Sequence, residues 1–142
     1  MSFASTRASG TLIASEPALA IEWSIARDAV RDALPDLELP PAHRRGGDVV
    51  LCITVTRSSC SAELRDTRSG ETHPVELGAV KVDSLRADEF VHVTVREGHD
   101  TLLAATVREE PGPSRLLYAH TALLDRLGIR GGRYARPMLS AE

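Results

Sequence analysis

Two runs of alternating apolar residues, separated by a short polar turn, occupy residues 89–109. The turn falls at residues 97–100, where Gly98 lies between polar neighbours. The aliphatic residues share one parity on each side of the turn: Val91, Val93, Val95, Leu103, Ala105 and Val107. Side chains two positions apart lie on the same face of a strand. The pattern therefore predicts a β-hairpin with one aliphatic face, which another layer of the protein must cover.

The predicted cover is an amphipathic helix from Ser15, as its cap, to about Leu34, which precedes Pro35. One helical stripe collects the apolar residues Leu19, Trp23, Ala26, Val30, Ala33 and Leu34. Such a stripe indicates a helix with one buried face, anchored on the sheet by Trp23. Ile21 and Ile25 lie off this stripe, which indicates a wider buried face or a second contact.

Further strands are expected around this pair of elements, because β-prone runs recur between turns. They cover residues 49–56, which we expect in the centre of the sheet, and 62–66, 75–82, 115–120 and 134–136. Residues 83–88 are expected to be a connection. Thr121 is expected to cap a short helix that Gly128 ends in the left-handed conformation.

This order predicts an α+β fold. One long N-terminal amphipathic helix packs on a mostly antiparallel sheet, or a partly closed barrel, of about five to seven strands, with a short helix near the C-terminus. A chain of 142 residues can bury a full core as one domain. We expect residues 1–10 to be a flexible N-terminus and residues 11–142 to form a single globular domain.

The segment Leu116 to Arg136 combines a strand, a short helix ended by Gly128, and a Gly131-Gly132 turn before a last strand. In this order it resembles the half-motif of cradle-loop barrels. Family members usually carry an acidic residue after the second glycine, where this chain has Arg133, and no second copy of the motif lies upstream. The resemblance therefore implies a local arrangement and carries no function.

Net charge and hydropathy indicate which classes of partner the chain is expected to lack. The net charge is −3, which gives no reason to expect bulk attraction to nucleic acid. Lys81 is the one lysine among 17 basic residues. An arginine excess can serve carboxylate or phosphate recognition, although a GC-rich coding sequence explains it as well. No apolar run approaches the roughly 20 residues of a membrane helix, and no signal-peptide core is present. We expect a cytoplasmic protein without membrane contact.

The reactive side chains form no catalytic or metal-binding motif. Cys52 and Cys60 do not have the spacing of a zinc site. We expect both thiols to be reduced, although a hairpin that brought them close together would allow a disulfide. None of the five histidines forms a local chelating pair. No catalytic residue, metal site or cofactor is predicted.

His92 is the strongest candidate for ligand contact. It shares a strand face with Phe90 and Thr94, opposite the valines. If that face lines a pocket, the imidazole could act as a base near neutral pH, whereas on an outer face it is simply a half-exposed strand residue. The candidate ligand-binding residues are His92, Phe90, Tyr118 and His120.

The C-terminal segment is the one region with an excess of positive charge. After residue 114, five arginines face only Asp125 and Glu142. Guanidinium groups beside an aromatic ring can dock onto an acidic partner or a phosphate, although a solvated turn explains them as well. The candidate partner-binding residues are Arg126, Arg130, Arg133, Tyr134 and Arg136.

Three functions remain open. The first is a non-enzymatic accessory or protein-interaction domain, whose partner is another protein or a second copy in a homodimer. The second is a small ligand-binding protein or enzyme with an apolar pocket between helix and sheet, which a filled core would exclude. The third and weakest is nucleic-acid or phosphate binding through the arginine-rich end.

Overall fold

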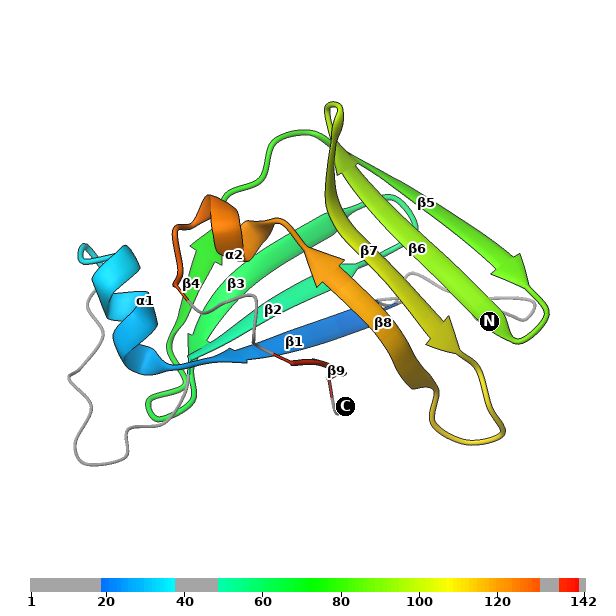
Figure 1. Ribbon diagram of the computed structural model, residues 1–142, viewed down its shortest axis with the longest axis horizontal. Helices are drawn as coiled ribbons and strands as arrows, with labels where there is room; N and C mark the ends of the chain where they lie inside the picture. The colour runs from blue at the N-terminus through cyan, green and yellow to red at the C-terminus, as the bar shows by residue number, and fades with distance from the viewer. Residues whose placement is uncertain (1–18, 38–48, 131–135, 141–142) are drawn as a thin grey trace.

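The computed structural model describes residues 19–37, 49–130 and 136–140, and in them the chain forms two antiparallel sheets and two short helices (Figure 1). The first sheet, ordered β4-β3-β2-β1-β9, contains β1 (Leu19–Ile25), β2 (Val49–Val55), β3 (Cys60–Asp66), β4 (Thr72–Val75) and β9 (Pro137–Leu139). The second sheet, ordered β5-β6-β7-β8, contains β5 (Val80–Ala87), β6 (Phe90–Glu97), β7 (Asp100–Arg108) and β8 (Arg115–Thr121). The helices are α1 (Arg27–Ala33) and α2 (Leu123–Arg126).

The predicted α+β fold with a long N-terminal helix is wrong. Residues 19–25 form strand β1, and the helix that follows, α1, has only seven residues. The four apolar residues of β1 alternate with Ala20, Glu22 and Ser24 and are all buried: Leu19, Ile21, Trp23 and Ile25. Ile21 and Ile25, which did not fit the helical stripe, belong to this period of two.

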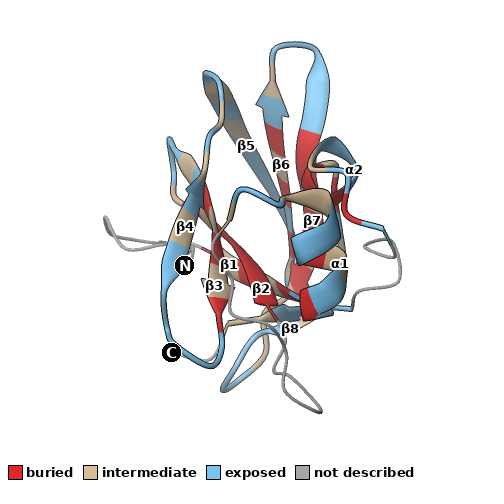
Figure 2. Cartoon of the chain, turned by 90° about the vertical axis from the view of Figure 1, so that its left-hand side faces the viewer, coloured by how far each residue is buried: buried red, intermediate tan, exposed pale blue. Residues whose placement is uncertain are grey.

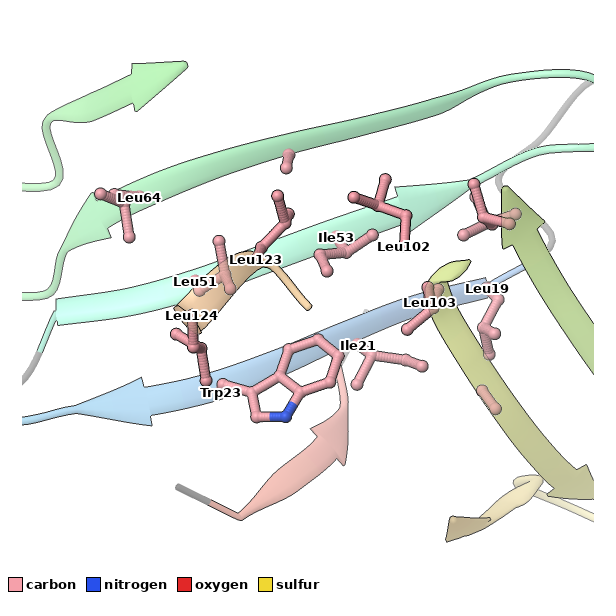
Figure 3. Packing of buried hydrophobic residues seen from close by; sticks show 14 of the residues in the cluster. Leu19, Ile21, Trp23, Leu51, Ile53, Leu64, Leu102, Leu103, Leu123 and Leu124 are labelled. Atoms are coloured by element: carbon pink, nitrogen blue, oxygen red, sulfur yellow. The ribbon is translucent and has the colours of Figure 1, made fainter. Parts of the chain in front are cut away.

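The cover of the aliphatic hairpin face is consequently the first sheet. One hydrophobic cluster joins the inner faces of both sheets and includes Trp23, Val93 and Leu103. Figure 3 shows Ile21 and Trp23 of β1 on the same side of the sheet as Leu51 and Ile53 of β2. The register places Ile21 opposite Ile53 and Trp23 opposite Leu51, so cross-strand pairs build the core.

The hairpin prediction is confirmed. Strands β6 and β7 pair with Val91 opposite Val107, Val93 opposite Ala105 and Val95 opposite Leu103. All six of these side chains are buried. The prediction of a central strand at residues 49–56 is also confirmed, since β2 is the third of five strands and pairs with both β1 and β3.

The segment from residue 75 to residue 88 differs from its prediction. The single strand expected over 75–82 is divided between β4, which ends at Val75, and β5, which begins at Val80. The intervening residues carry the chain from one sheet to the other (Figure 1). The connection expected at 83–88 is instead the second half of β5, which continues to Ala87 before Asp88 turns the chain at a φ of 57°.

The C-terminal part follows its prediction as far as residue 130. The N-cap of α2 is Ala122 and not Thr121, although the Thr121 hydroxyl accepts the Leu123 amide N–H at 3.1 Å. Gly128 has a φ of 73°, the left-handed conformation expected there. The last strand lies at Pro137–Leu139 and pairs with β1. The predicted flexible residues 1–10, the Ser15 cap and the Gly131-Gly132 turn lie outside the described residues.

A buried ion pair closes one end of the first sheet. Arg27, the first residue of α1, donates two hydrogen bonds to the Asp66 carboxylate, at 3.0 and 2.5 Å. Both side chains are at most 2% exposed. Asp66 also accepts the Arg68 amide N–H at 3.0 Å, and the pKa of its carboxyl is held well below the usual range by Arg27. The pair thus joins the β1–α1 junction to the end of β3.

Removing one partner of the Arg27–Asp66 pair should lower the stability of the protein. For Asp66→Asn we expect the free energy of unfolding in urea to fall by about 3–5 kcal/mol, because Arg27 is left charged and buried. The matched control is Glu22→Gln, which breaks the partly exposed Arg65–Glu22 pair and should cost under about 1 kcal/mol. The double variant Arg27→Met with Asp66→Leu should regain most of the loss. Equal losses of stability for Asp66→Asn and Glu22→Gln would contradict a structural role of the buried pair.

The same pair should make stability depend on pH. Because the pKa of Asp66 is lower in the folded state, its contribution is complete above the unfolded value of about 3.9 and is lost as the pH falls further. We therefore expect the stability difference between wild type and Asp66→Asn to shrink below about pH 4. Acid titration of both proteins by Trp23 fluorescence measures it, and a difference independent of pH would contradict the assignment.

Candidate functional site

The outer face of the second sheet carries all four predicted ligand-binding residues. Since Val91, Val93 and Val95 point toward the first sheet, the intervening side chains of β6 point away from it. The register extends this alternation to the neighbouring strands. We define the outer face as Lys81, Asp83, Leu85 and Ala87 of β5, Phe90, His92, Thr94 and Arg96 of β6, Ala104, Thr106 and Arg108 of β7, and Arg115, Tyr118 and His120 of β8.

Cross-strand pairing arranges this face in rows. One row runs over all four strands through Leu85, His92, Thr106 and Tyr118. His92 Nδ1 lies 3.0 Å from the Thr106 hydroxyl oxygen, which orients the imidazole along the row. The two ends of the row are apolar and exposed, with Leu85 at 66% and Tyr118 at 55%. His120 lies in the adjacent row, opposite Ala104.

The structure thus brings Phe90, His92, Tyr118 and His120 to one face, but on the side away from the hydrophobic core. The pocket was expected between the N-terminal helix and the sheet, and residues 19–25 form no helix there. The inner faces are occupied by the packed cluster around Trp23 (Figure 3). Ligand binding by these four residues therefore stays a prediction, and any ligand would lie on an open sheet surface.

One end of the outer face is occupied by contacts within the chain. The Arg108 guanidinium lies 5.9 Å from the centre of the Phe90 ring and pairs with Glu89 at 2.8 Å. Glu110 lies 3.8 Å from Arg108 and 3.5 Å from Arg115. The glutamates around Phe90 consequently balance the arginines there, and this end presents little net charge to a partner.

The opposite end carries a different pattern of charge. Lys81 of β5 lies directly opposite Arg96 of β6, and like charges in this arrangement repel. Asp83, two residues along the same face of β5, lies opposite the neutral Thr94. The outer face of β5 therefore presents a cation and then an anion next to the sheet edge.

Strand β5 is the least protected edge among the described strands. Only β6 pairs with it in the sheet, so the peptide groups on its other side have no strand partner there. From Ser84 to Ala87 its residues are exposed on both faces, and Figure 2 shows the strand in the colours of exposed and half-buried residues. The sequence prediction missed this edge because residues 84–87 do not continue the alternation of apolar and polar side chains that Val80, Lys81, Val82 and Asp83 begin.

The other sheet edges are interrupted. Strand β4 has four residues and contains Pro74, and β9 has three residues and begins with Pro137. Proline lacks the amide that a strand partner needs. Strand β8 has a register shift at the Thr106/Val107 step, and such bulges hinder continuous pairing. Strand β5 pairs with β6 over all eight residues without a shift.

The predicted partner-binding residues are not gathered by the described part of the chain. Arg126 pairs with Glu97 at 2.6 Å and lowers the pKa of that carboxyl, which also accepts the Gly78 amide N–H at 2.5 Å. Glu97, the last residue of β6, thus contacts both α2 and Gly78, which precedes β5. Arg130 and Arg136 are exposed, whereas Arg133 and Tyr134 lie outside the described residues.

The two thiols are held apart by the register. Cys52 lies opposite Glu63 and Cys60 opposite Val55, so the β2–β3 hairpin does not align them, and both cysteines are free. Burial raises the pKa of both thiols, that of Cys60 to about 11. Around neutral pH both groups are protonated, which disfavours nucleophilic chemistry.

Alkylation should report this protection. At about pH 8 we expect iodoacetamide to modify neither thiol of the native protein appreciably, because the thiolate is the nucleophile. In urea both should react readily, since an unperturbed thiol has a pKa of about 8.5. Mass spectrometry of quenched samples measures the modification, with the urea sample as control. Rapid labelling of native Cys60 would contradict the assigned protonation state.

Within the described ranges, no three histidine, cysteine or acidic residues are placed to hold a metal ion, and no helix is long and apolar enough to cross a membrane. Comparison with protein-family models, with curated proteins and with solved structures found no match. The geometry of the second sheet is therefore the basis on which a function can be argued.

Proposed function

We propose that this protein is a non-enzymatic interaction domain that binds an extended protein segment along the edge of β5. The observation that carries the proposal is an eight-residue edge strand, Val80–Ala87, paired without interruption on one side only. A bound segment would add a strand to the second sheet and hydrogen-bond to peptide groups on the side of β5 away from β6.

Side-chain exposure along β5 supports the same surface. Val80 and Val82 are half-buried against the core, so the first half of the strand is held in place. The second half projects with both faces exposed, and Leu85 has the largest exposed fraction among the exposed large hydrophobic residues of the described chain. A rigid strand beside an exposed apolar side chain provides both backbone pairing and a contact for specificity.

The charges on β5 favour a selective partner. Natural proteins place charged residues on edge strands to prevent unspecific pairing. Lys81 and Asp83 have opposite signs and point to the same face, so a segment that places an anion opposite Lys81 and a cation opposite Asp83 would be accepted and a uniformly charged one rejected. The charges on β5 thus restrict which segments can pair with this edge, but they do not prevent pairing.

Photo-crosslinking in cells tests this surface. With a photoreactive residue in place of Leu85, we expect discrete adducts of defined mass, because that side chain borders the bound segment. The matched control carries the same residue in place of Leu117, which is also exposed but lies at the β8 bulge. Gel mobility and peptide mass spectrometry identify the adducts. Adducts that are absent at 85, or identical from both positions, would overturn the proposal.

A further inference from the structure

We propose that the segment bound at this edge is β5 of a second copy of the chain, antiparallel to the first across a twofold axis that passes beside Val82. This inference rests on the proposed function and names its partner. It requires that the β5 sequence be complementary to itself in one register.

Symmetry restricts the registers. A twofold axis perpendicular to the sheet keeps the two outer faces on the same side, so outer-face residues of one copy oppose outer-face residues of the other. Neighbouring registers of this kind differ by two residues in the opposed pairs. One of them places Lys81 against Lys81 of the second copy, and another places Asp83 against Asp83 of the second copy. Like charges disfavour both.

The register between these two is complementary. With Val82 opposite Val82 of the second copy, each Lys81 faces Asp83 of the second copy, and the contact occurs twice. Within one chain, Lys81 has Arg96 on its other side, and this repulsion is relieved when a carboxylate arrives from the second copy. Asp83, whose own sheet offers it Thr94, gains a cation in the same step.

The inner face agrees with this register. Val82 packs against the core of its own chain, and the pairing sets the two Val82 side chains side by side, so the valine layer continues from one copy into the other. Leu85 then lies beside residues 78–79 of the second copy, where that chain enters β5. The second sheets of the two copies would thus join into one continuous sheet of eight strands, with the β5 edges covered.

A competing register would oppose Leu85 to Leu85 of the second copy. It joins the exposed Leu85 side chains of the two copies but sets Asp83 against Ala87, so Asp83 gains no cation. Lys81 would face Glu89, a turn residue outside β5 that already pairs with Arg108. The charge pattern therefore favours the Val82-centred register, and charge reversal distinguishes the two.

The test uses the full chain and light scattering coupled to size exclusion, with sedimentation equilibrium for affinities. Wild type should be dimeric at high concentration. Lys81→Asp and Asp83→Lys should each weaken the dimer by about tenfold or more, because each replaces two attractive contacts by two repulsive ones. An equimolar mixture of the two variants should form a heterodimer, since every facing pair is then of opposite sign. The double variant with both changes should dimerise again.

The matched control is Arg57→Asp, the same change of charge at an exposed turn of the first sheet, which should leave the dimer unchanged. A dimer insensitive to both single variants, or a mixture that does not associate, would overturn the Val82-centred register. A wild type that stays monomeric at its solubility limit would overturn self-association altogether. Adducts from position 85 to a different protein would then still support the proposed strand addition, so the two failures are distinguishable.

Discussion

A guanidinium and a carboxylate that are almost completely withdrawn from water join the start of α1 to the end of β3. Removing two charges from water is expensive, and only good geometry compensates for it. Here Asp66 accepts two hydrogen bonds from Arg27 and a third from the Arg68 amide. Because Asp66 lies opposite Val49, which lies opposite Ile25, the pair spans the row that ends β1, β2 and β3. It joins the chain just after β1 to the end of β3, and β1 supplies Ile21 and Trp23 to the core.

The second sheet depends on that first sheet for its stability and on its own outer face for any contact with partners. Its inner valines and leucines are buried against β1 and β2, whereas its outer face carries rings, hydroxyls and charges. Near Phe90 the charges balance one another within the chain. At β5 the cation and anion stand beside a strand edge with no partner in the sheet. The same alternation that builds the core therefore leaves one organised surface for association.

Local signals were sufficient for some elements and not for others. The hairpin of β6 and β7 was predictable because its turn and both alternating strands lie within about twenty residues. The β1 segment was not, because Leu19, Trp23 and Ala26 fit a helical stripe as well as Leu19, Ile21 and Trp23 fit a strand. The outer face with His92 followed from alternation alone. The β5 edge did not follow from alternation, because residues 84–87 do not continue the alternation of apolar and polar side chains that residues 80–83 begin. Only their pairing with β6 makes them part of a strand.

The sequence by itself determined which side chains alternate, where glycine and proline turn the chain, and that the valines of β6 share a face. These are properties of neighbouring residues, and the backbone geometry of a strand translates them directly. Tertiary structure alone decided that β1 is a strand, that a sheet and not a helix covers those valines, and that β5 is an edge. Each of these depends on which distant segment offers hydrogen bonds and apolar surface, and cross-strand partners such as Ile53 for Ile21 lie far away in the chain.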